Sequence, residues 1–391
     1  MFPFKKLPSA ALPAVYIANI LLAFHWGLII YINSSFLERF IGAEKIGIIY
    51  TVSSLISLFI FLSVSKFIKQ VGTYPISIFF IIAECIAITG LILSSNVYVI
   101  VPLFILHTIS VPMILFTLDI FLEGNITDES KTGGLRSLFL TLSNTALVLS
   151  PLIFGLIIHN NEFGNVYLLS VLFLIPLFFL IVKFFRHFED TAEVVHTKLL
   201  QTVVLFVKNK NIFNIFKAHL LLQFFYAWMI IYMPIHLVQN IGFNWAEIGM
   251  LFSIMLLPFI LFEIPLGQMA DKRTGEKEIL IAGIFITALS VAVIPFISTP
   301  NFFLWAIILF TTRTGASFVE IATESYFFKQ VNGSNGESIS FFRLTRPLSF
   351  IMAPIVATFA LLFMPFEATF FVLSIIIMWG ATYAFPLVDS K

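Results

Sequence analysis

Polar side chains recur at helical spacing within one apolar stretch, residues 301–325. Arg313, Ser317, Glu320 and Glu324 follow i, i+4, i+7 and i+11, so they share one helical face. The planar fork of donors on an arginine suits an anionic group, and burial favours the protonated form of a carboxyl. These residues could therefore bind an anionic solute and a proton. An Arg313–Glu320 ion pair that only stabilises the fold is the alternative, and a pair that breaks on protonation would serve both roles.

Further polar side chains interrupt other apolar stretches. An ionisable group at membrane depth costs roughly 2.5–3.5 kcal/mol, so it normally faces a cavity or a partner. A histidine can also change its protonation near neutral pH. The candidates for contact with a solute or a proton are His25, His107, His219, Gln223 and Tyr226, the last three at i, i+4 and i+7. Histidines that only bond a neighbouring helix are the alternative. Glu84 is another buried acid, and the sequence indicates no partner for it.

The composition shows what kind of chain must position these residues. Of 391 residues 59% are hydrophobic and 11% are charged, whereas soluble domains have about 25% charged residues. A membrane protein is therefore expected. The net charge of +1 gives no reason to expect nucleic acid as a partner, and the single cysteine, Cys85, excludes an internal disulfide. Phosphate-binding glycine loops, zinc-protease motifs and nucleophile elbows do not occur, so we predict neither an enzyme nor a cofactor or metal.

Twelve stretches are long and apolar enough to cross a membrane as helices, which takes about 20 residues each. They are 11–33, 46–65, 74–94, 98–122, 136–158, 165–185, 212–238, 246–268, 279–297, 301–325, 339–362 and 367–387. Since strand patterns do not compete, we predict an all-α integral membrane protein with twelve transmembrane helices.

The lysines and arginines between these stretches predict the orientation, because cytoplasmic loops are enriched in them. One side has only Arg39 and Lys45. The other side has Lys5, Lys6, Lys66, Lys69, Lys131, Arg136, Lys183, Arg186, Lys198, Lys208, Lys210, Lys217, Lys272, Arg273, Lys277, Lys329 and Lys391. Both termini are therefore expected in the cytoplasm and the chain in the plasma membrane.

Charged residues also gather at the predicted cytoplasmic ends of the helices. Asp119 in the fourth stretch corresponds to Glu324 in the tenth at a shift of 205 residues, and Glu123 follows Asp119 by one turn. The neighbouring fifth and eleventh stretches begin with Arg136, Arg343 and Arg346. We expect salt bridges that gate the cytoplasmic side, and solvated helix ends are the alternative.

The two halves of the chain resemble each other. A charged linker, 187–211, separates residues 1–186 from 212–391, so each half has six predicted spans. At a shift of 203 residues Lys69 meets Lys272 and Gly72 meets Gly275, with Ile68 where Asp271 stands. Two pseudo-symmetric six-helix bundles are expected.

The hairpin after the eighth stretch reads Gly267-Gln268-Met269-Ala270-Asp271-Lys272-Arg273-Thr274-Gly275-Glu276-Lys277. This sequence resembles the loop signature of the major facilitator superfamily of transporters, with one extra residue before the second glycine. The resemblance implies two parallel six-helix repeats, and a central cavity lined by spans one, four, seven and ten. Arg313, Glu320 and the histidines named above would then face that cavity. Asp271, with Lys272, Gly267 and Gly275, would help to close the cytoplasmic side at a helix N-terminus.

The resemblance implies a secondary active transporter that moves a small organic solute by alternating access. We expect coupling to protons through Glu320, with sodium as the alternative, and import and export remain equally open. The protein is expected to be a monomer in the lipid bilayer. A sensor or scaffold that resembles a transporter but no longer transports is the competing hypothesis, and the loss of the first-half aspartate at Ile68 favours it.

Overall fold

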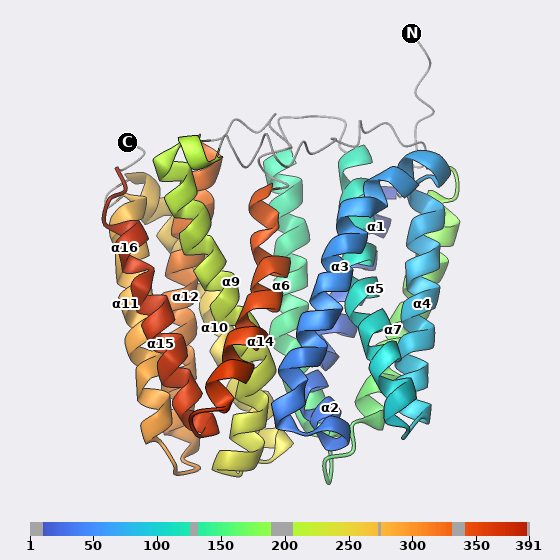
Figure 1. The fold of residues 1–391 in the computed structure, drawn as a ribbon. Helices are drawn as coiled ribbons and strands as arrows, with labels where there is room; N and C mark the ends of the chain where they lie inside the picture. Colours follow the sequence, from blue (N-terminus) through green and yellow to red (C-terminus); the bar gives the residue numbers. More distant parts are fainter. Residues whose placement is uncertain (1–10, 126–131, 189–205, 273–274, 331–340, 389–391) are drawn as a thin grey trace. The chain divides into compact units, whose positions relative to one another are not determined.

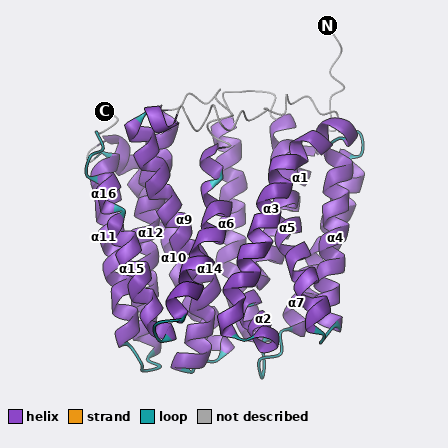
Figure 2. Cartoon of the chain, in the orientation of Figure 1, coloured by secondary structure: helices purple, strands orange, loops and turns teal. Residues whose placement is uncertain are grey.

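The chain is helical throughout its described part (Figure 2). The computed structural model describes residues 11–125, 132–188, 206–272, 275–330 and 341–388, and these residues contain no strand. Twelve of the helical stretches are long and apolar enough to cross a membrane. The predicted all-α architecture with twelve transmembrane helices is confirmed.

The helices divide into two compact units, the first made of residues 1–32 and 52–194. Within it α1 packs against α6 and α7, and α4 packs against α5 and α7. The helices are α1 (Ala11–Ile29), α4 (Thr73–Leu93), α5 (Val97–Gly124), α6 (Thr132–Ile157), α7 (Gly164–Phe185) and the later part of α3 (Ala43–Val71). A buried amide fixes one of these contacts, because Asn19 of α1 donates to the Phe139 carbonyl of α6 at 2.7 Å.

The second unit comprises residues 33–51 and 195–391. In it α12 packs against α9, α10 and α11, and α11 packs against α15, as can be followed in Figure 1. The helices are α2 (Asn33–Ile41), the start of α3, α9 (Lys210–Ile235), η2 (His236–Ile241), α10 (Trp245–Lys272), α11 (Glu276–Val293), η3 (Ile294–Phe296), α12 (Phe302–Gln330), α14 (Thr345–Leu361), η4 (Phe366–Ala368), α15 (Thr369–Trp379) and α16 (Ala381–Ala384).

The start of the chain differs from the predicted single span 11–33. Helix α1 ends at Ile29, and Asn33 begins the separate helix α2, which packs against α9 of the second unit. Gly47 of α3 explains why this segment joins that unit: a Cβ there would lie 2.8 Å from the Pro354 carbonyl oxygen of α14. A glycine allows this close approach of two helices. Most of the predicted linker, residues 189–205, lies outside the described part.

Glycines with positive φ mark the internal repeat. Gly72 (φ 90°) and Gly275 (φ 82°) cap the N-termini of α4 and α11 with nearly the same ψ, 163° and 164°. Gly42 (φ 78°) and Gly242 (φ 90°) end the helical segments before α3 and α10. Side chains rarely adopt this conformation, so glycine is favoured there. The backbone therefore repeats at two corresponding places in the two halves, and the sequence alignment at a shift of 203 residues indicated one of them, Gly72 with Gly275.

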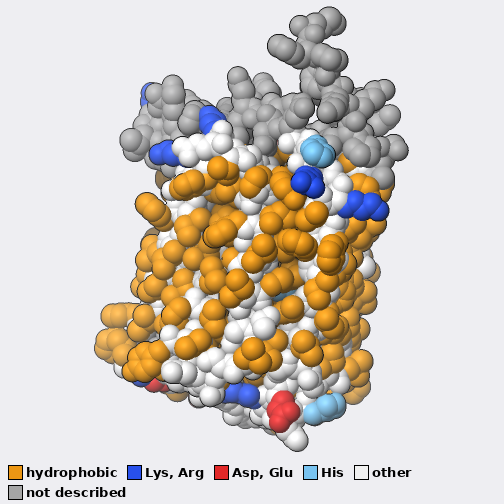
Figure 3. Space-filling view, turned by 90° about the vertical axis from the view of Figure 1, so that its right-hand side faces the viewer, with side chains coloured by type: hydrophobic (Ala, Val, Ile, Leu, Met, Phe, Trp, Pro, Cys, Tyr) orange, Lys and Arg blue, Asp and Glu red, His pale blue; other side chains and the backbone are white. Residues whose placement is uncertain are grey.

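A broad apolar face covers part of the first unit. Figure 3 shows hydrophobic side chains across it, with charged side chains toward the ends of the helices. The large exposed residues include Phe79, Ile82 and Ile86 of α4, and Leu172, Ile175 and Phe179 of α7. Contiguous exposed apolar area of this kind is expected where a surface meets lipid.

Candidate functional site

A buried acid in the first unit lies between two histidines. The Glu84 Oε1 of α4 is 2.9 Å from His25 Nε2 of α1 and 2.6 Å from His107 Nδ1 of α5. His25 and Glu84 are 0% exposed and His107 is 3% exposed. Three helices thus contribute one cluster of ionisable side chains to the interior of the first unit.

A fourth helix orients this His25–Glu84–His107 cluster. The His25 Nδ1 lies 3.0 Å from the backbone carbonyl oxygen of Ser170 on α7. A carbonyl oxygen only accepts hydrogen bonds, so the Nδ1 carries the hydrogen and the Nε2 points at Glu84. The two contacts to Glu84 Oε1 are hydrogen-bond distances. Two ligands of one tetrahedral metal ion would be about 3.3 Å apart, so the cluster is arranged as a hydrogen-bonded network.

This cluster could be predicted only in part. The sequence marked His25 and His107 as candidate solute contacts, with bonding to a neighbouring helix as the alternative. In the structure both bond to Glu84, the acid for which the sequence indicated no partner. Burial of Glu84 in an apolar stretch was the available signal, but its partners lie 59 and 23 residues away along the chain.

The second unit positions an arginine, a tyrosine and an acid together. The Arg313 guanidinium carbon of α12 lies 4.9 Å from the Tyr226 ring centre, 5.4 Å from that of Phe225 and 5.9 Å from that of Phe259. The Tyr226 hydroxyl donates to Glu320 Oε2 at 2.8 Å. Tyr226 of α9 therefore contacts both the cation and the acid of α12. Arg313 is buried, whereas Glu320 is half-buried.

His219 and Gln223 form a separate chain of hydrogen bonds between α9 and α12. The Thr323 hydroxyl donates to the Val319 carbonyl at 2.8 Å, so its oxygen accepts from His219 Nδ1 at 3.1 Å. The Gln223 amide nitrogen lies 3.3 Å from His219 Nε2 and donates to it. A neutral His219 satisfies both contacts. Thr323 is the participant that the sequence did not indicate.

The two remaining residues of the predicted face on α12, Ser317 and Glu324, bond partners outside the arginine cluster. Ser317 donates its hydroxyl to the Thr314 carbonyl of its own helix at 2.8 Å. Glu324 bonds Arg343 at 2.9 Å near the helix ends. The polar face of α12 therefore divides into an interior part around Arg313 and Glu320 and an end part around Glu324.

The expected salt bridges at the helix ends occur inside each unit. Glu123 of α5 pairs with Arg136 of α6 in the first unit, as Glu324 pairs with Arg343 in the second. Asp119, the predicted counterpart of Glu324, is half-buried and also has an interaction of its own. Arg346 is exposed. Whether these pairs gate transport remains a prediction.

The structure shows in which helices the hairpin residues of the predicted gate lie. Gly267, Asp271 and Lys272 belong to the last turns of α10, and Gly275 precedes α11. The side chains of Asp271 and Lys272 lie outside the described part of the structure. Ile68, at the first-half position that corresponds to Asp271, is 2% exposed in the apolar core of its unit.

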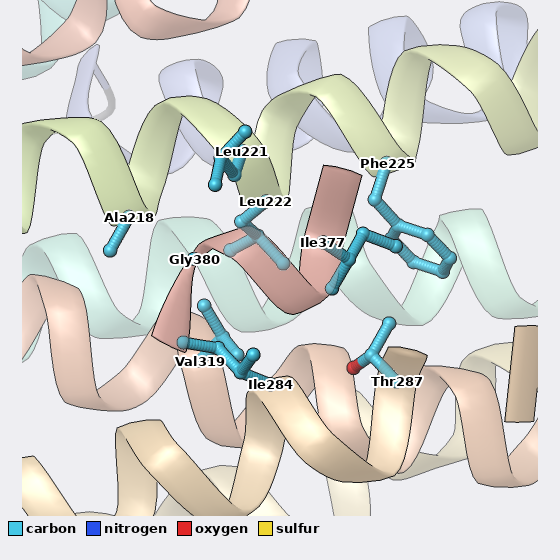
Figure 4. Close-up of a pocket in the computed structure, with 9 residues that line it drawn as sticks. All are labelled: Ala218, Leu221, Leu222, Phe225, Ile284, Thr287, Val319, Ile377 and Gly380. Atoms are coloured by element: carbon cyan, nitrogen blue, oxygen red, sulfur yellow. The ribbon is translucent and has the colours of Figure 1, made fainter. Parts of the chain in front are cut away.

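A small cavity lies beside the arginine cluster in the second unit (Figure 4). Its volume is about 20 Å³, which is room for about one water. The lining comes from α9, α11, α12, α15 and Gly380, and Thr287 is its one polar side chain among those labelled in Figure 4. Phe225 contributes both to this lining and to the rings around Arg313. The cavity is too small for an organic solute.

Comparison with known proteins indicates the class of this chain. Residues 215–390 match the family model described as Major Facilitator Superfamily. No significant match occurs among curated proteins. Solved structures with the same fold include the nucleoside transporter NupG, at 13% identity and TM-score 0.73 over 97% of this chain and 100% of that one.

A mutant of NupG is similar at 14% identity and TM-score 0.72, over 96% of this chain and 98% of that one. The POT family transporter PepTSo is similar at 13% identity and TM-score 0.75, over 97% of this chain and 98% of that one. At such identities these structures support the fold alone. With the family match in the second half, they indicate a multi-pass membrane transporter of a small molecule and not an enzyme. Residues 215–390 thus match the major facilitator superfamily, and nearly the whole chain has the fold of these two transporters.

Proposed function

We propose that this chain is a proton-coupled secondary transporter of a small polar or amphiphilic solute, which works by alternating access. The observation that supports this most is the arrangement of Arg313, Tyr226 and Glu320 inside the membrane helices of the second unit. Burying such groups is costly. A transporter needs them, because a solute and a coupling ion must be bound at membrane depth.

Arg313 is the proposed contact for the solute. Three aromatic rings hold its guanidinium by cation–π attraction, which is worth about 2 kcal/mol when the groups are desolvated. The fork of donors suits a carboxylate, phosphate or other anionic group. Because Arg313 is 3% exposed, the solute reaches it when the helices part, as alternating access requires.

Glu320 is the proposed coupling residue. Its Oε2 accepts from the Tyr226 hydroxyl at 2.8 Å. Protonation of the carboxylate weakens its hold on that donor and on nearby positive charge. Tyr226 also faces Arg313, so a proton on Glu320 alters the surroundings of the proposed solute contact. This linkage makes solute binding depend on proton binding.

The remaining parts of the proposal follow from the loop charges. Seventeen of the 22 lysines and arginines lie on one side of the predicted spans, which supports cytoplasmic termini and a plasma-membrane location. We further propose that one chain is the transport unit.

Uptake into vesicles tests the proposed function. The purified protein is reconstituted in lipid vesicles, and radiolabelled uridine is the first probe because one structural neighbour is a nucleoside transporter. A library of labelled organic anions follows. We expect at least one solute to accumulate when a pH gradient is imposed, and the sign of the effective gradient distinguishes import from export. Accumulation driven only by a sodium gradient would contradict proton coupling.

Matched variants locate the coupling residue. Glu320→Gln should keep solute exchange but lose accumulation driven by the pH gradient, since it cannot release a proton. Glu278→Gln is the control, because Glu278 is an exposed acid on α11 of the same unit. Unchanged accumulation in Glu320→Gln would remove this residue from the coupling mechanism.

A further inference from the structure

We propose that the His25–Glu84–His107 cluster is a second proton-binding site, which locks four helices of the first unit together while its proton is bound. The inference extends the proposed function, on which its role in transport rests. The site lies in the first unit, apart from the arginine cluster that we assign to the solute. It combines an acid and two imidazoles, all buried.

Counting hydrogens shows that the cluster holds a transferable proton. His25 Nδ1 uses its hydrogen on the Ser170 carbonyl. Each of the two remaining contacts, at 2.9 Å and 2.6 Å, ends on the same Glu84 oxygen and needs a hydrogen of its own. His107 Nδ1–H supplies one of these hydrogens, and the second lies on the line between Glu84 Oε1 and His25 Nε2.

That second hydrogen can move without any change in total charge. When it sits on Glu84, a neutral acid lies between two neutral imidazoles. When it sits on His25, a carboxylate faces an imidazolium. Both forms satisfy the two contacts. If the proton leaves the cluster, the lone pairs of His25 Nε2 and Glu84 Oε1 face each other, and one negative charge stays buried.

The loss of this proton is therefore coupled to opening of the unit. A buried charge without compensation costs several kcal/mol. The other carboxyl oxygen, Glu84 Oε2, makes no hydrogen bond within the described part of the chain, so it offers a negative charge no further stabilisation. The packed arrangement keeps the proton, and release requires water or another donor to reach the acid.

Four helices meet at the cluster, which gives the proton a mechanical effect. His25 and the Ser170 carbonyl join α1 to α7, and Glu84 and His107 join α4 to α5. The bond between His25 and Glu84 connects these two pairs. Loss of the shared proton breaks that connection, so only helix packing, such as that of α4 against α7, then holds the α1–α7 pair and the α4–α5 pair together.

Other titratable groups of the surrounding helices do not supply a nearby full charge. Besides the cluster, the described parts of α1, α3, α4, α5, α6 and α7 in this unit contain Tyr16, Lys66, Lys69, Tyr74, Cys85, Tyr98, Asp119, Glu123, Arg136, Tyr167 and Lys183. Cys85 and Tyr167 are closest along their helices and are neutral. Asp119 lies twelve residues beyond His107, about 18 Å along α5 at 1.5 Å per residue.

Hydrogen exchange of backbone amides tests the lock without any solute. The full-length protein in lipid nanodiscs is compared at neutral and alkaline pH, after correction for the intrinsic pH dependence of exchange. We expect amides of α4 and α5 around the cluster to exchange faster at alkaline pH, by about a hundredfold if the opening relieves a buried charge.

Glu84→Gln should abolish this pH effect, because a glutamine amide neither gains nor loses a proton over this pH range. Glu162→Gln is the matched control, an exposed acid in a loop of the same unit. An equal pH effect in Glu84→Gln and wild type would overturn the proposal. So would protection restored by zinc ions with no dependence on pH, which would identify a metal site instead.

A measurement on the wild type alone covers the case in which Glu84→Gln does not fold. Infrared spectra report a protonated carboxyl, and ¹⁵N NMR of labelled histidines reports an imidazolium. We expect one or the other in the cluster at neutral pH. A carboxylate with both imidazoles neutral would contradict the proposal. If the exchange result holds but no solute moves in vesicles, the proton site stands and the transport proposal fails.

Discussion

The two units bury their acids in opposite ways. Glu84 of the first unit is completely buried and shares one oxygen with two histidines from two other helices. Glu320 of the second unit is half-buried and accepts from the hydroxyl of Tyr226, on the face that also carries Arg313. Glu84 is thus shielded from solvent and bonds two imidazoles. Glu320 lies beside a permanent cation, which suits it to a charged solute.

This difference shows which features of the repeat were kept. The glycines at the helix starts and the acid–arginine pairs at the helix ends occur in both units. These features determine where helices begin and end. The buried ionisable clusters differ between the two units, because the helix arrangement does not determine which polar side chains lie inside. The fold can therefore be shared while the two units do different work.

The largest expected effect is the loss of the buried acid. Glu84→Ala removes the partner of two histidines and should destabilise the protein by about 3–5 kcal/mol. Glu320→Ala should cost about 1 kcal/mol, as expected for one net hydrogen bond. Unfolding of both variants in detergent, followed by circular dichroism, measures the difference. Equal losses of stability would show that Glu84 and Glu320 stabilise their units to the same extent, which would contradict the difference described for the two units.

The second-largest expected effect is the loss of stability when a glycine between packed helices is replaced by alanine. In α11 a Cβ at Gly283 would lie 2.7 Å from the Gly315 carbonyl oxygen, whereas at Gly27 of α1 its closest contact is the Ser150 hydroxyl, at 2.6 Å. A backbone carbonyl cannot rotate away from the new methyl group, whereas a serine side chain can. Gly283→Ala should therefore lower the stability of the protein by about 2 kcal/mol, and Gly27→Ala by less.

The same unfolding assay measures both variants. Gly164→Ala serves as the control, because a Cβ there meets nothing within 4 Å. If Gly27→Ala proved as costly as Gly283→Ala, the side-chain contact in the first unit would be as rigid as the backbone contact in the second.

A smaller effect is expected for the tyrosine that links cation and acid. Tyr226→Phe keeps the ring over Arg313 but removes the hydroxyl that donates to Glu320. It should lower stability by about 1 kcal/mol and alter the pH dependence of uptake more than the affinity for solute. Uptake measured across a series of pH values tests this, and a pH profile identical to that of wild type would argue against a role of Tyr226 in coupling.

The smallest effect concerns the paired helix ends. Glu123→Gln and Glu324→Gln each remove one partly exposed ion pair, so each should change stability by less than about 1 kcal/mol. Equivalent positions in the repeat should give similar values. A large loss for only one of them would mean that this pair has a further role, such as gating.

The sequence predicts the fold well because each span is long and apolar by itself. The break after Ile29 was not predicted, since it depends on how neighbouring helices pack. The face shared by Arg313 and Glu320 follows from helical spacing. Their link through Tyr226 does not, because it joins residues 94 positions apart in the chain.

For the same reason, burial of Glu84 could be expected but its two histidine partners could not. An apolar stretch indicates that a residue is inside the membrane, and only the packing of α1, α4 and α5 decides what it meets there. Likewise, the assignment of residues 33–51 to the second unit depends on the close approach at Gly47 rather than on composition.

The most direct test of the account is accumulation of a transported solute in vesicles under a pH gradient, with wild type, Glu320→Gln and Glu84→Gln compared side by side. We predict that wild type accumulates the solute, and that both variants exchange it across the membrane but do not accumulate it. Accumulation that persists in both variants, or that needs no gradient in wild type, would contradict proton coupling through these two buried acids.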